Sequence, residues 1–477
     1  MTADSPSTSE TAAQRLARLD QAHVWHPFTP MRQWREQPPT VVERGEGAWL
    51  IDTDGNRYID GVSSIWCNVH GHRVAAIDGA IREQLDRIAH STLLGLASPP
   101  SIELAAMLAQ RAPGSLNQTF YSDAGATALE LAFKMAVGYW YHRGRPGKHK
   151  FIGLAGAYHG DTVGAMSVGY SELFHRPFLP MVFDVTSFPN PDPCRPPGGL
   201  TRADDGGWPG EDVALGEAMR DHCLAALDTM LAERGGETAA VVIEPVMQGA
   251  AGMIPQPAGF LKGVERLARK HDVLLIADEV ATGFGRTGRL FAVEHESVEP
   301  DLLCLAKGIS GGYLPLAATM ATDEVAAAFE GEPGERRTLF HGHTYTGNAL
   351  ACAAGVASLR LFEQRDLIAH INESAAIIRD GLAPLRDGRA FPHVMDVRQR
   401  GIMVGIELCR DRGRAEPFDF AARAGAAFCL AARPRGLFIR PLGDVAILMP
   451  IPAMDHATLE RMLEIVVATA RDWRPGA

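Results

Sequence analysis

The chain has 477 residues, of which 46% are hydrophobic and 22% are charged, and its formal net charge is −11. This length exceeds what one compact core holds, so two or more domains are expected, and the composition is that of an ordinary globular protein. The acidic balance argues against non-specific nucleic-acid binding, and no run of about 18 apolar residues indicates a membrane span.

The N-terminal region is predicted to be a tail followed by short strands. Residues 1–15 are rich in Ser, Thr and Ala and lack the basic start and apolar stretch of a signal peptide, so we expect a disordered tail. Between Leu16 and Gly71, the apolar run Trp49–Asp52 and the turn residues Asp54-Gly55-Asn56 predict a hairpin.

Helical and strand patterns then alternate. A helical stripe begins at Ile77, and a second helix follows the strand around Phe120-Tyr121. The further predicted elements are strands at Phe151–Leu154, Ala240–Glu244, Val273–Ala277 and Leu302–Ala306, and a helix at Leu261–His271. This order predicts an α/β fold, with a central, mostly parallel sheet covered by helices on both faces.

The remaining segments divide the chain. Pro189–Glu211 contains six prolines, five glycines and four acids, which predicts a long surface loop. Helices are predicted at Ala349–Phe362 and near Thr458–Asp472, around a strand–helix–strand region. We therefore expect a large domain over residues 73–345 and a small α+β domain over 346–477, to which residues 16–72 contribute.

An acid and a lysine end two of the predicted strands. Val273–Ala277 runs into Asp278, and Leu302–Ala306 runs into Lys307. In a parallel sheet, both side chains would emerge at the carboxyl edge, where such folds bind ligands. The pair suits pyridoxal phosphate, because a lysine forms a Schiff base with its aldehyde and an acid keeps its pyridine nitrogen protonated. Such a pair also arises by chance in α/β proteins.

A dinucleotide site is an alternative reading of the same stretch. Gly283, Gly285 and Gly288 spell G-x-G-x-x-G after a strand. Two features oppose it. The strand ends in Asp278-Glu279, where a pyrophosphate would lie, and the motif lies mid-chain instead of on the first βα turn.

Three further positions are candidate ligand contacts. The small residues of Ser122–Ala126, between a strand and a helix, would let backbone N–H groups approach a phosphate. Tyr158 could stack on a planar ring, and Arg440 could grip a carboxylate with two hydrogen bonds. An ordinary helix start, a packing aromatic and a solvated rim charge are the structural alternatives.

Cysteines and histidines give no strong metal signal. The seven cysteines form no C-x-x-C pair, which predicts free thiols in the reducing cytoplasm. His341 and His343 are two residues apart, but no acidic or cysteine partner lies near them in the sequence, so we expect no metal there.

Together these motifs resemble the class III aminotransferases, which are fold-type I, subgroup II, pyridoxal-phosphate enzymes. The resemblance rests on Asp278–Gly288 (DEVATGFGRTG) with Lys307-Gly308, and it covers nearly the whole chain. Ala281 favours the biotin-pathway branch, since ornithine-type and GABA-type relatives usually carry glutamine there. The stretches that resemble this branch are Trp25–Thr29, Ser63–Trp66, Ala89–Ser91, Tyr158–Thr162, His341–Tyr345 and Ile439–Gly443.

The resemblance also implies roles for single residues. Lys307 would hold the cofactor and move the proton between Cα and C4′, and Asp278 would pair with the pyridinium. The other cofactor contacts would be Gly125, Ala126, Tyr158, Val280, Gln248 and His343, with Thr344 of the partner subunit in a homodimer. The substrate contacts would be Phe28, Trp66, Tyr158, Gly342 and Arg440, with Arg440 on the carboxylate of 8-amino-7-oxononanoate.

The amino donor and two alternative functions stay open. Members that use S-adenosylmethionine often carry tyrosine where this chain has Phe28, so lysine is the other candidate donor. A broad ω-amine:pyruvate transaminase would share the fold. A non-catalytic sensor on an enzyme scaffold would usually have lost Lys307 or Asp278, and both are present.

Overall fold

Seven strands form the central sheet, in the order β4-β12-β11-β10-β7-β5-β6. The computed structural model describes residues 10–37, 39–201, 211–412, 414 and 416–475. The strands are β4 (Leu116–Ser122), β5 (Lys150–Leu154), β6 (Thr186–Phe188), β7 (Thr238–Ile243), β10 (Leu274–Asp278), β11 (Leu302–Leu305) and β12 (Ala317–Thr322). In the central sheet, β12 runs opposite to the other six strands, so the prediction of a mostly parallel sheet is confirmed.

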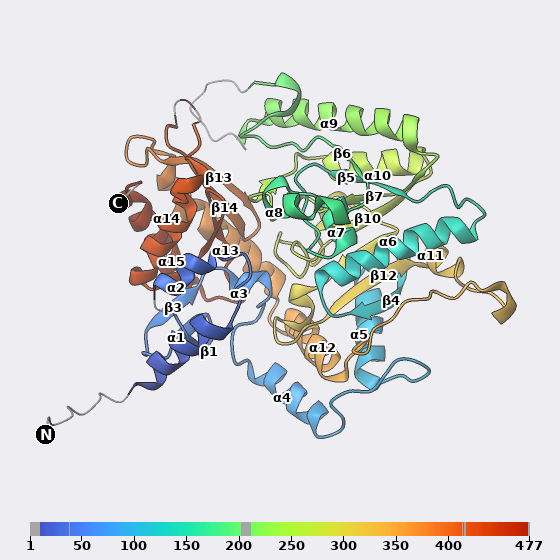
Figure 1. Ribbon diagram of the computed structural model, residues 1–477, viewed down its shortest axis with the longest axis horizontal. Coiled ribbons are helices and arrows are strands. Elements are labelled where there is room, and N and C mark those ends of the chain that lie inside the picture. Colours follow the sequence, from blue (N-terminus) through green and yellow to red (C-terminus); the bar gives the residue numbers. More distant parts are fainter. Residues whose placement is uncertain (1–9, 38, 202–210, 413, 415, 476–477) are drawn as a thin grey trace, which may run out of the picture.

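Helices cover both faces of this sheet (Figure 1). Alternate residues of one strand enter different core clusters: Val241 and Ile243 pack on one face, Ala240 and Val242 on the other. α6 (Gly125–His142) covers the second face, and the first is covered by α5 (Pro99–Ala109), α9 (Val213–Arg234), α10 (Phe260–Lys270) and α12 (Ala349–Gln364). Because both faces are buried, the central strands β7, β10 and β11 are nearly continuous apolar runs.

Two smaller sheets lie beside the large one. The first has the order β1-β2-β3-β15 and the second β13-β14-β17-β16. Their strands are β1 (Val42–Glu46), β2 (Trp49–Asp52), β3 (Arg57–Asp60), β13 (Val394–Arg400), β14 (Met403–Leu408), β15 (Leu437–Phe438), β16 (Arg440–Leu442) and β17 (Val445–Leu448). β8 (Met247–Gln248) and β9 (Ile254–Pro255) form a two-stranded ribbon.

The N-terminal strands are tied to the C-terminal region. β15 pairs in parallel with β3, so Leu437 lies opposite Ile59 and Phe438 opposite Asp60. Figure 1 shows the blue N-terminal elements beside the red C-terminal ones. α12, which we expected in the small domain, packs on α4 (Ala75–Leu85) and α5. The domain boundaries proposed from the sequence remain a proposal.

Segments expected to be irregular are partly structured. α1 (Ala12–His23) begins before residue 15, where Thr11 and Gln14 form a capping box, and residues 1–9 lie outside the described residues. In the proline-rich stretch, residues 202–210 also lie outside the described residues. Its described part is held to the C-terminal sheet by Arg195, whose guanidinium pairs with Asp192 at 3.1 Å and Glu407 at 2.5 Å.

The remaining helices are α2 (Met31–Glu36), α3 (Ser63–Trp66), α7 (Val163–Val168), α8 (Glu172–His175), α11 (Asp323–Ala327), α13 (Leu367–Leu382), α14 (Ala424–Ala432) and α15 (His456–Asp472). Within the described ranges, none of the helices has the length and apolarity needed to cross a membrane.

Candidate active site

The acid and the lysine predicted at the sheet edge lie on neighbouring parallel strands. Asp278 is the last residue of β10, and Lys307 follows β11, where it begins the short 3-10 helix η5 (Lys307–Ser310). Lys307 has a φ of +46°, in the left-handed region that side chains other than glycine rarely adopt. Strain of this kind is typical of functional positions. The glycine-rich stretch after β10 forms turns, and not the α-helix that a dinucleotide site requires, so that alternative is wrong.

A buried histidine holds the carboxylate of Asp278. Nδ1 of His159 lies 2.6 Å from Oδ2 of Asp278, and Oδ1 accepts the N–H of Val280 at 3.0 Å. Burial lowers the pKa of His159, but the hydrogen bond and charge of Asp278 outweigh it and raise that pKa above its ordinary value. The Asp278 carboxylate is therefore fixed in orientation, and a cation is favoured beside it.

The ammonium group of Lys307 lies in a buried, acidic environment. Burial lowers the pKa of Lys307, and the charges of Asp278 and Glu244 oppose this effect. Glu244 accepts the backbone N–H groups of Tyr158 (3.2 Å) and Gly249 (2.9 Å), and burial raises its pKa to about 7. Nζ of Lys307 lies 5.1 Å from the centre of the Trp66 ring. Because burial lowers its pKa, Lys307 loses its proton more readily than a free lysine and can then act as a base.

Small residues crowd the start of α6. A Cβ atom on Gly125 would lie 2.6 Å from Cγ1 of Val280, and one on Gly160 would lie 2.4 Å from Cβ of Ala126. A side chain at position 125 would therefore require Val280 to move, and this position begins a helix whose first backbone N–H groups lack intrahelical partners and attract anions. The phosphate site predicted at this turn stays a prediction, which the small residues and the exposed N–H groups of the helix start favour.

Aromatic side chains from three segments contact one another in a row that begins at Tyr158. The ring of Tyr158 lies 6.2 Å from that of Phe174, which lies 5.6 Å from Phe28. The hydroxyl of Tyr158 donates to Oδ2 of Asp161 at 2.8 Å. Phe28 is 61% exposed, so it can contact a ligand that enters from solvent.

Gln248 and Arg440 have unused hydrogen-bonding capacity. Gln248 is fully buried; its Nε2 donates to the carbonyl of Ala155 at 3.1 Å, and its Oε1 has no partner within the described part of the chain. Arg440 begins β16, and no described carboxylate lies within ion-pair distance of it. Both groups are available to a ligand.

The segment around His341 is mostly exposed. Gly342 and Thr344 are exposed, and a Cβ on Gly342 would have no atom within 4 Å. Nδ1 of His341 lies 3.1 Å from Nζ of Lys134, and the backbone N–H of His343 donates to Thr346.

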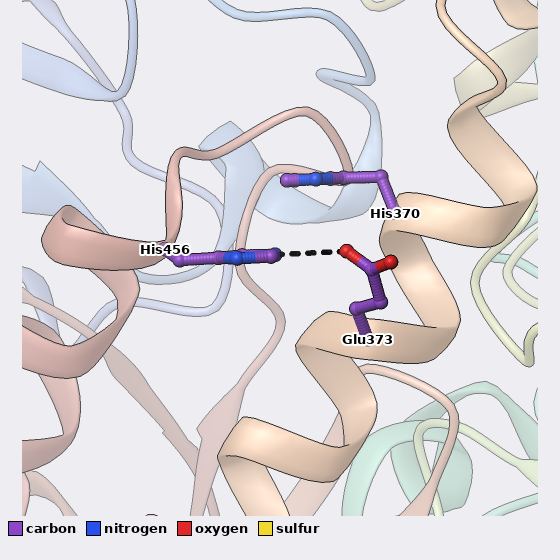
Figure 2. A group of neighbouring side chains, drawn as sticks. All are labelled: His370, Glu373 and His456. Carbon is purple, nitrogen blue, oxygen red and sulfur yellow. Dashed lines mark ion pairs between the residues drawn. The ribbon is translucent and has the colours of Figure 1, made fainter.

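A separate group of titratable side chains lies between α13 and α15 (Figure 2). His370 and His456 stack with ring centres 4.5 Å apart and planes 3° from parallel, and Nε2 of His456 lies 3.9 Å from Glu373. Imidazole binds a metal along lone pairs in the ring plane. The lone pairs of two parallel, stacked rings do not converge on one point, so this arrangement is not a formed ligand set.

These groups fit pyridoxal phosphate. Nε2 of His159 and Oε1 of Gln248 are buried and lack partners among the described residues, as expected for atoms that bond to a polar ligand. Lys307 and Asp278 match the aldehyde and the ring nitrogen in chemistry, and the start of α6 suits the phosphate.

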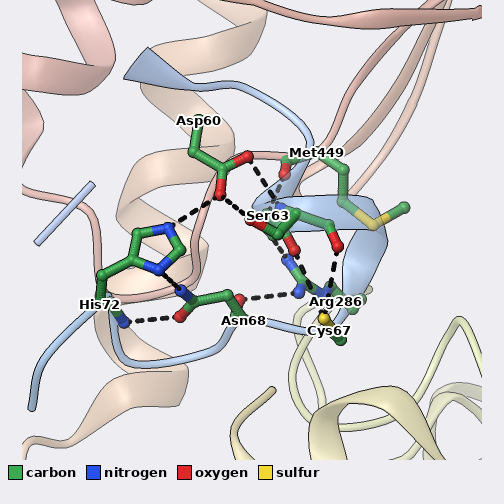
Figure 3. Close-up of polar contacts among 9 residues, drawn as sticks. Asp60, Ser63, Cys67, Asn68, His72, Arg286 and Met449 are labelled. Carbon is green, nitrogen blue, oxygen red and sulfur yellow. Dashed lines mark hydrogen bonds and ion pairs between the residues drawn. The ribbon is translucent and has the colours of Figure 1, made fainter. Parts of the chain in front are cut away.

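Sequence reasoning assigned no role to three residues that the structure places in this network. In the sequence, His159 stands out only because it follows Tyr158, and Glu244 only because it lies four residues before Gln248. Arg286 is 1% exposed and donates to Ser63 Oγ and to the carbonyls of Pro450 and Asn68, at 3.1, 2.9 and 3.0 Å (Figure 3). In the sequence, the only indication of a role for Arg286 is its position inside the glycine-rich stretch.

Known proteins resemble this chain along most of its length. The family model for aminotransferase class-III matches residues 31–469. A protein of Geobacter sulfurreducens named adenosylmethionine-8-amino-7-oxononanoate aminotransferase is 48% identical over 451 residues, covering 94% of this chain and 96% of its own. The solved structure of the protein of that name from Methanocaldococcus jannaschii has a TM-score of 0.88 at 41% identity, covering 96% and 99% of the two chains. An (S)-enantioselective omega-transaminase from Thermomicrobium roseum also has a TM-score of 0.88, at 34% identity, covering 96% and 98%. The chain therefore belongs to the class-III aminotransferases, which are pyridoxal-phosphate-dependent enzymes of fold-type I.

Proposed function

We propose that this enzyme transfers an amino group to 8-amino-7-oxononanoate and forms 7,8-diaminononanoate for biotin biosynthesis. The observation that carries this proposal is the similarity to five relatives named for that acceptor. They are 44–48% identical and each covers at least 91% of this chain. The pocket chemistry agrees, since the acceptor combines a carboxylate, which Arg440 can bind, with an aliphatic chain.

We propose the following roles at the reacting end of the substrate. Pyridoxal phosphate, when bound, supplies an aldehyde that captures amines and a ring that accepts the electron pair of a broken C–H bond. Lys307, whose pKa burial lowers, takes the proton from the substrate Cα as a neutral amine and returns it at C4′. Asp278, oriented by His159, keeps the ring nitrogen protonated.

The remaining contacts hold the two molecules in place. We propose that Gly125 and Ala126 bind the phosphate through backbone N–H groups, that Tyr158 and Val280 pack on the two ring faces, and that Gln248 bonds the ring hydroxyl through its unpaired oxygen. The other proposed contacts are Trp66, Phe28, Gly342 and Arg440 for the substrate, and His343 for the cofactor.

We also propose a homodimer in which Thr344 of the partner subunit reaches the phosphate. Large apolar side chains are exposed near the 340–345 segment, including Phe340 at 73% and Tyr345 at 62%, and Leu94 is 83% exposed. The rings of His90 and Tyr345 have centres 4.9 Å apart and are tilted by 52°, so the 90–94 and 340–345 segments adjoin. An exposed apolar patch of this kind is typical of a protein interface. The cytoplasmic location stays a prediction from the cysteine pattern.

A coupled assay with 8-amino-7-oxononanoate tests the function and identifies the donor. Purified enzyme is supplied with S-adenosylmethionine, L-lysine or 1-phenylethylamine, one at a time, and 7,8-diaminononanoate is measured. We expect product with one of the first two. Turnover of 1-phenylethylamine with pyruvate, and none of the oxo acid with any donor, would instead establish the ω-amine:pyruvate transaminase. An omega-transaminase from T. roseum has a similar structure.

A further inference from the structure

Trp66 is carried by a turn of unusual backbone conformation. Four consecutive residues, Ser63, Ser64, Ile65 and Trp66, have φ values of +46°, +42°, +68° and +68°. With ψ values of 48° and 63°, Ser64 and Ile65 lie in the left-handed helical region. None of the four is glycine, and Ile65 is β-branched, so each position is strained. A left-handed turn of this length persists only where surrounding contacts hold it.

One side of the turn is held by a buried carboxylate. Asp60, the last residue of β3, is fully buried. Its Oδ1 accepts the backbone N–H of Ser64 at 2.8 Å, and its Oδ2 accepts the hydroxyl of Ser64, also at 2.8 Å. Nε2 of His72 lies 3.1 Å from the same Oδ2 (Figure 3). Both donors of Ser64 therefore bind one fixed group.

The other side is held by the C-terminal region. The hydroxyl of Ser63 donates to the carbonyl of Met449 at 2.7 Å and accepts from Arg286 at 3.1 Å. Ile65, in contrast, is 49% exposed, and its side chain forms no polar contact. The polar side-chain anchors thus act at Ser63 and Ser64, directly before Ile65 and Trp66.

The turn determines where the Trp66 ring lies. The ring centre is 5.1 Å from Nζ of Lys307, and a Cβ on Gly249 would lie 3.2 Å from Cζ3 of Trp66. Trp66 also packs against the cluster that includes Met247 and Met449. A relaxed turn would move the ring away from all three contacts, because backbone rotation at Ser64 and Ile65 displaces every atom that follows.

We propose that Asp60 is a positioning residue for substrate binding, which clamps the left-handed turn through Ser64 and so sets the Trp66 ring beside Lys307. The clamp acts on the substrate only through Trp66. The inference about the substrate rests on the proposed function, whereas the placement of the ring does not.

Asp52 offers a matched control. It ends β2, next to β3, is 5% exposed, and accepts hydrogen bonds from Asp54, Asn56 and Tyr58. Asp52→Ala therefore also removes a buried, fully bonded carboxylate from the same small sheet, but one with no bond to the 63–66 turn. It separates a general loss of stability from a loss of positioning.

The test uses holoenzyme labelled with 5-fluorotryptophan, whose seven tryptophans give fluorine NMR resonances. Trp66→Phe assigns the signal of Trp66. In Asp60→Ala this signal should shift while the others stay, and the KM for the oxo acid should rise about tenfold with a smaller change in kcat. Asp52→Ala should lower the melting temperature and change neither the signal nor KM.

Two milder variants extend the test if Asp60→Ala does not fold. Asp60→Asn keeps an acceptor for the Ser64 N–H, and Ser64→Ala keeps the N–H but loses the hydroxyl, so each should shift the Trp66 signal by less. An unmoved Trp66 signal in every folded variant, or an equal shift in Asp52→Ala, would overturn the proposal. A wild-type enzyme that does not convert 8-amino-7-oxononanoate would overturn the proposed function and leave the fluorine result as the test of the clamp.

Discussion

Replacing His159 tests whether its hydrogen bond to Asp278 contributes to catalysis. The Nδ1–Oδ2 distance is 2.6 Å and both groups are at least 96% buried, so solvent cannot replace the lost donor. A hydrogen bond to a charged group contributes about 1.5–3 kcal/mol, which corresponds to about 10- to 150-fold in rate. We therefore expect His159→Leu to lower kcat by roughly this factor. His159→Asn, whose amide N–H can occupy the place of Nδ1, should recover part of the loss.

The assay measures kcat with saturating cofactor, together with cofactor affinity and the melting temperature of the unloaded protein. His271 provides the control, since its Nε2 lies 2.6 Å from Asp228 between α10 and α9, away from the sheet edge. His271→Asn should leave kcat unchanged. The reasoning fails if folded, cofactor-saturated His159→Leu keeps wild-type kcat, or if His159→Asn loses as much as His159→Leu.

Three further predictions concern the lysine, the arginine and pH. Borohydride reduction with peptide mapping should find the cofactor on Lys307 of the wild type. The variant Lys307→Ala should be colourless and should carry no adduct. An adduct on another residue of the wild type would refute the assignment. Arg440→Ala should raise the KM for the oxo acid about tenfold or more with little change in kcat, because a charge-assisted hydrogen bond is lost. An unchanged KM would show that Arg440 does not bind the substrate carboxylate. Burial lowers the pKa of His70 from 6.5 to about 4. Between these values the unfolded chain takes up a proton that the folded chain does not, so stability should fall as pH drops from 6.5 to about 4, by up to about 3 kcal/mol. Thermal melts of His70→Asn should show a smaller slope than the wild type, and equal slopes would contradict the assignment.

The sequence predicts the sheet wherever strands are long, apolar and followed by helices. Four of its seven strands are predicted as apolar runs, and Phe120-Tyr121 marks a fifth, because parallel strands buried on both faces require such runs. β12 (AATMAT) and β6 (TSF) escape prediction. The first consists mostly of Ala and Thr, and the second has only three residues, so neither has the pattern that marks a strand.

The site is predictable where chemistry depends on residue type and strand position, as for Asp278 and Lys307. It is not predictable where function depends on long-range contacts. Nothing near Asp60 in the sequence indicates that its carboxylate holds Ser64 in a left-handed conformation. The bond from Arg286 to Ser63 spans 223 positions, and only the folded chain brings these residues together.

The anchoring of Ser63 to Met449 has a consequence for biogenesis. The two residues are 386 positions apart, so the turn that carries Trp66 lacks this anchor until the ribosome has made nearly the entire chain. Domains generally form from the N-terminus during synthesis, and the large sheet can assemble before the last strands emerge. A nascent chain can thus contain Lys307 and the start of α6 before the turn that carries Trp66 is anchored. The proposed substrate contact at Trp66 is completed only when the final segment has been translated.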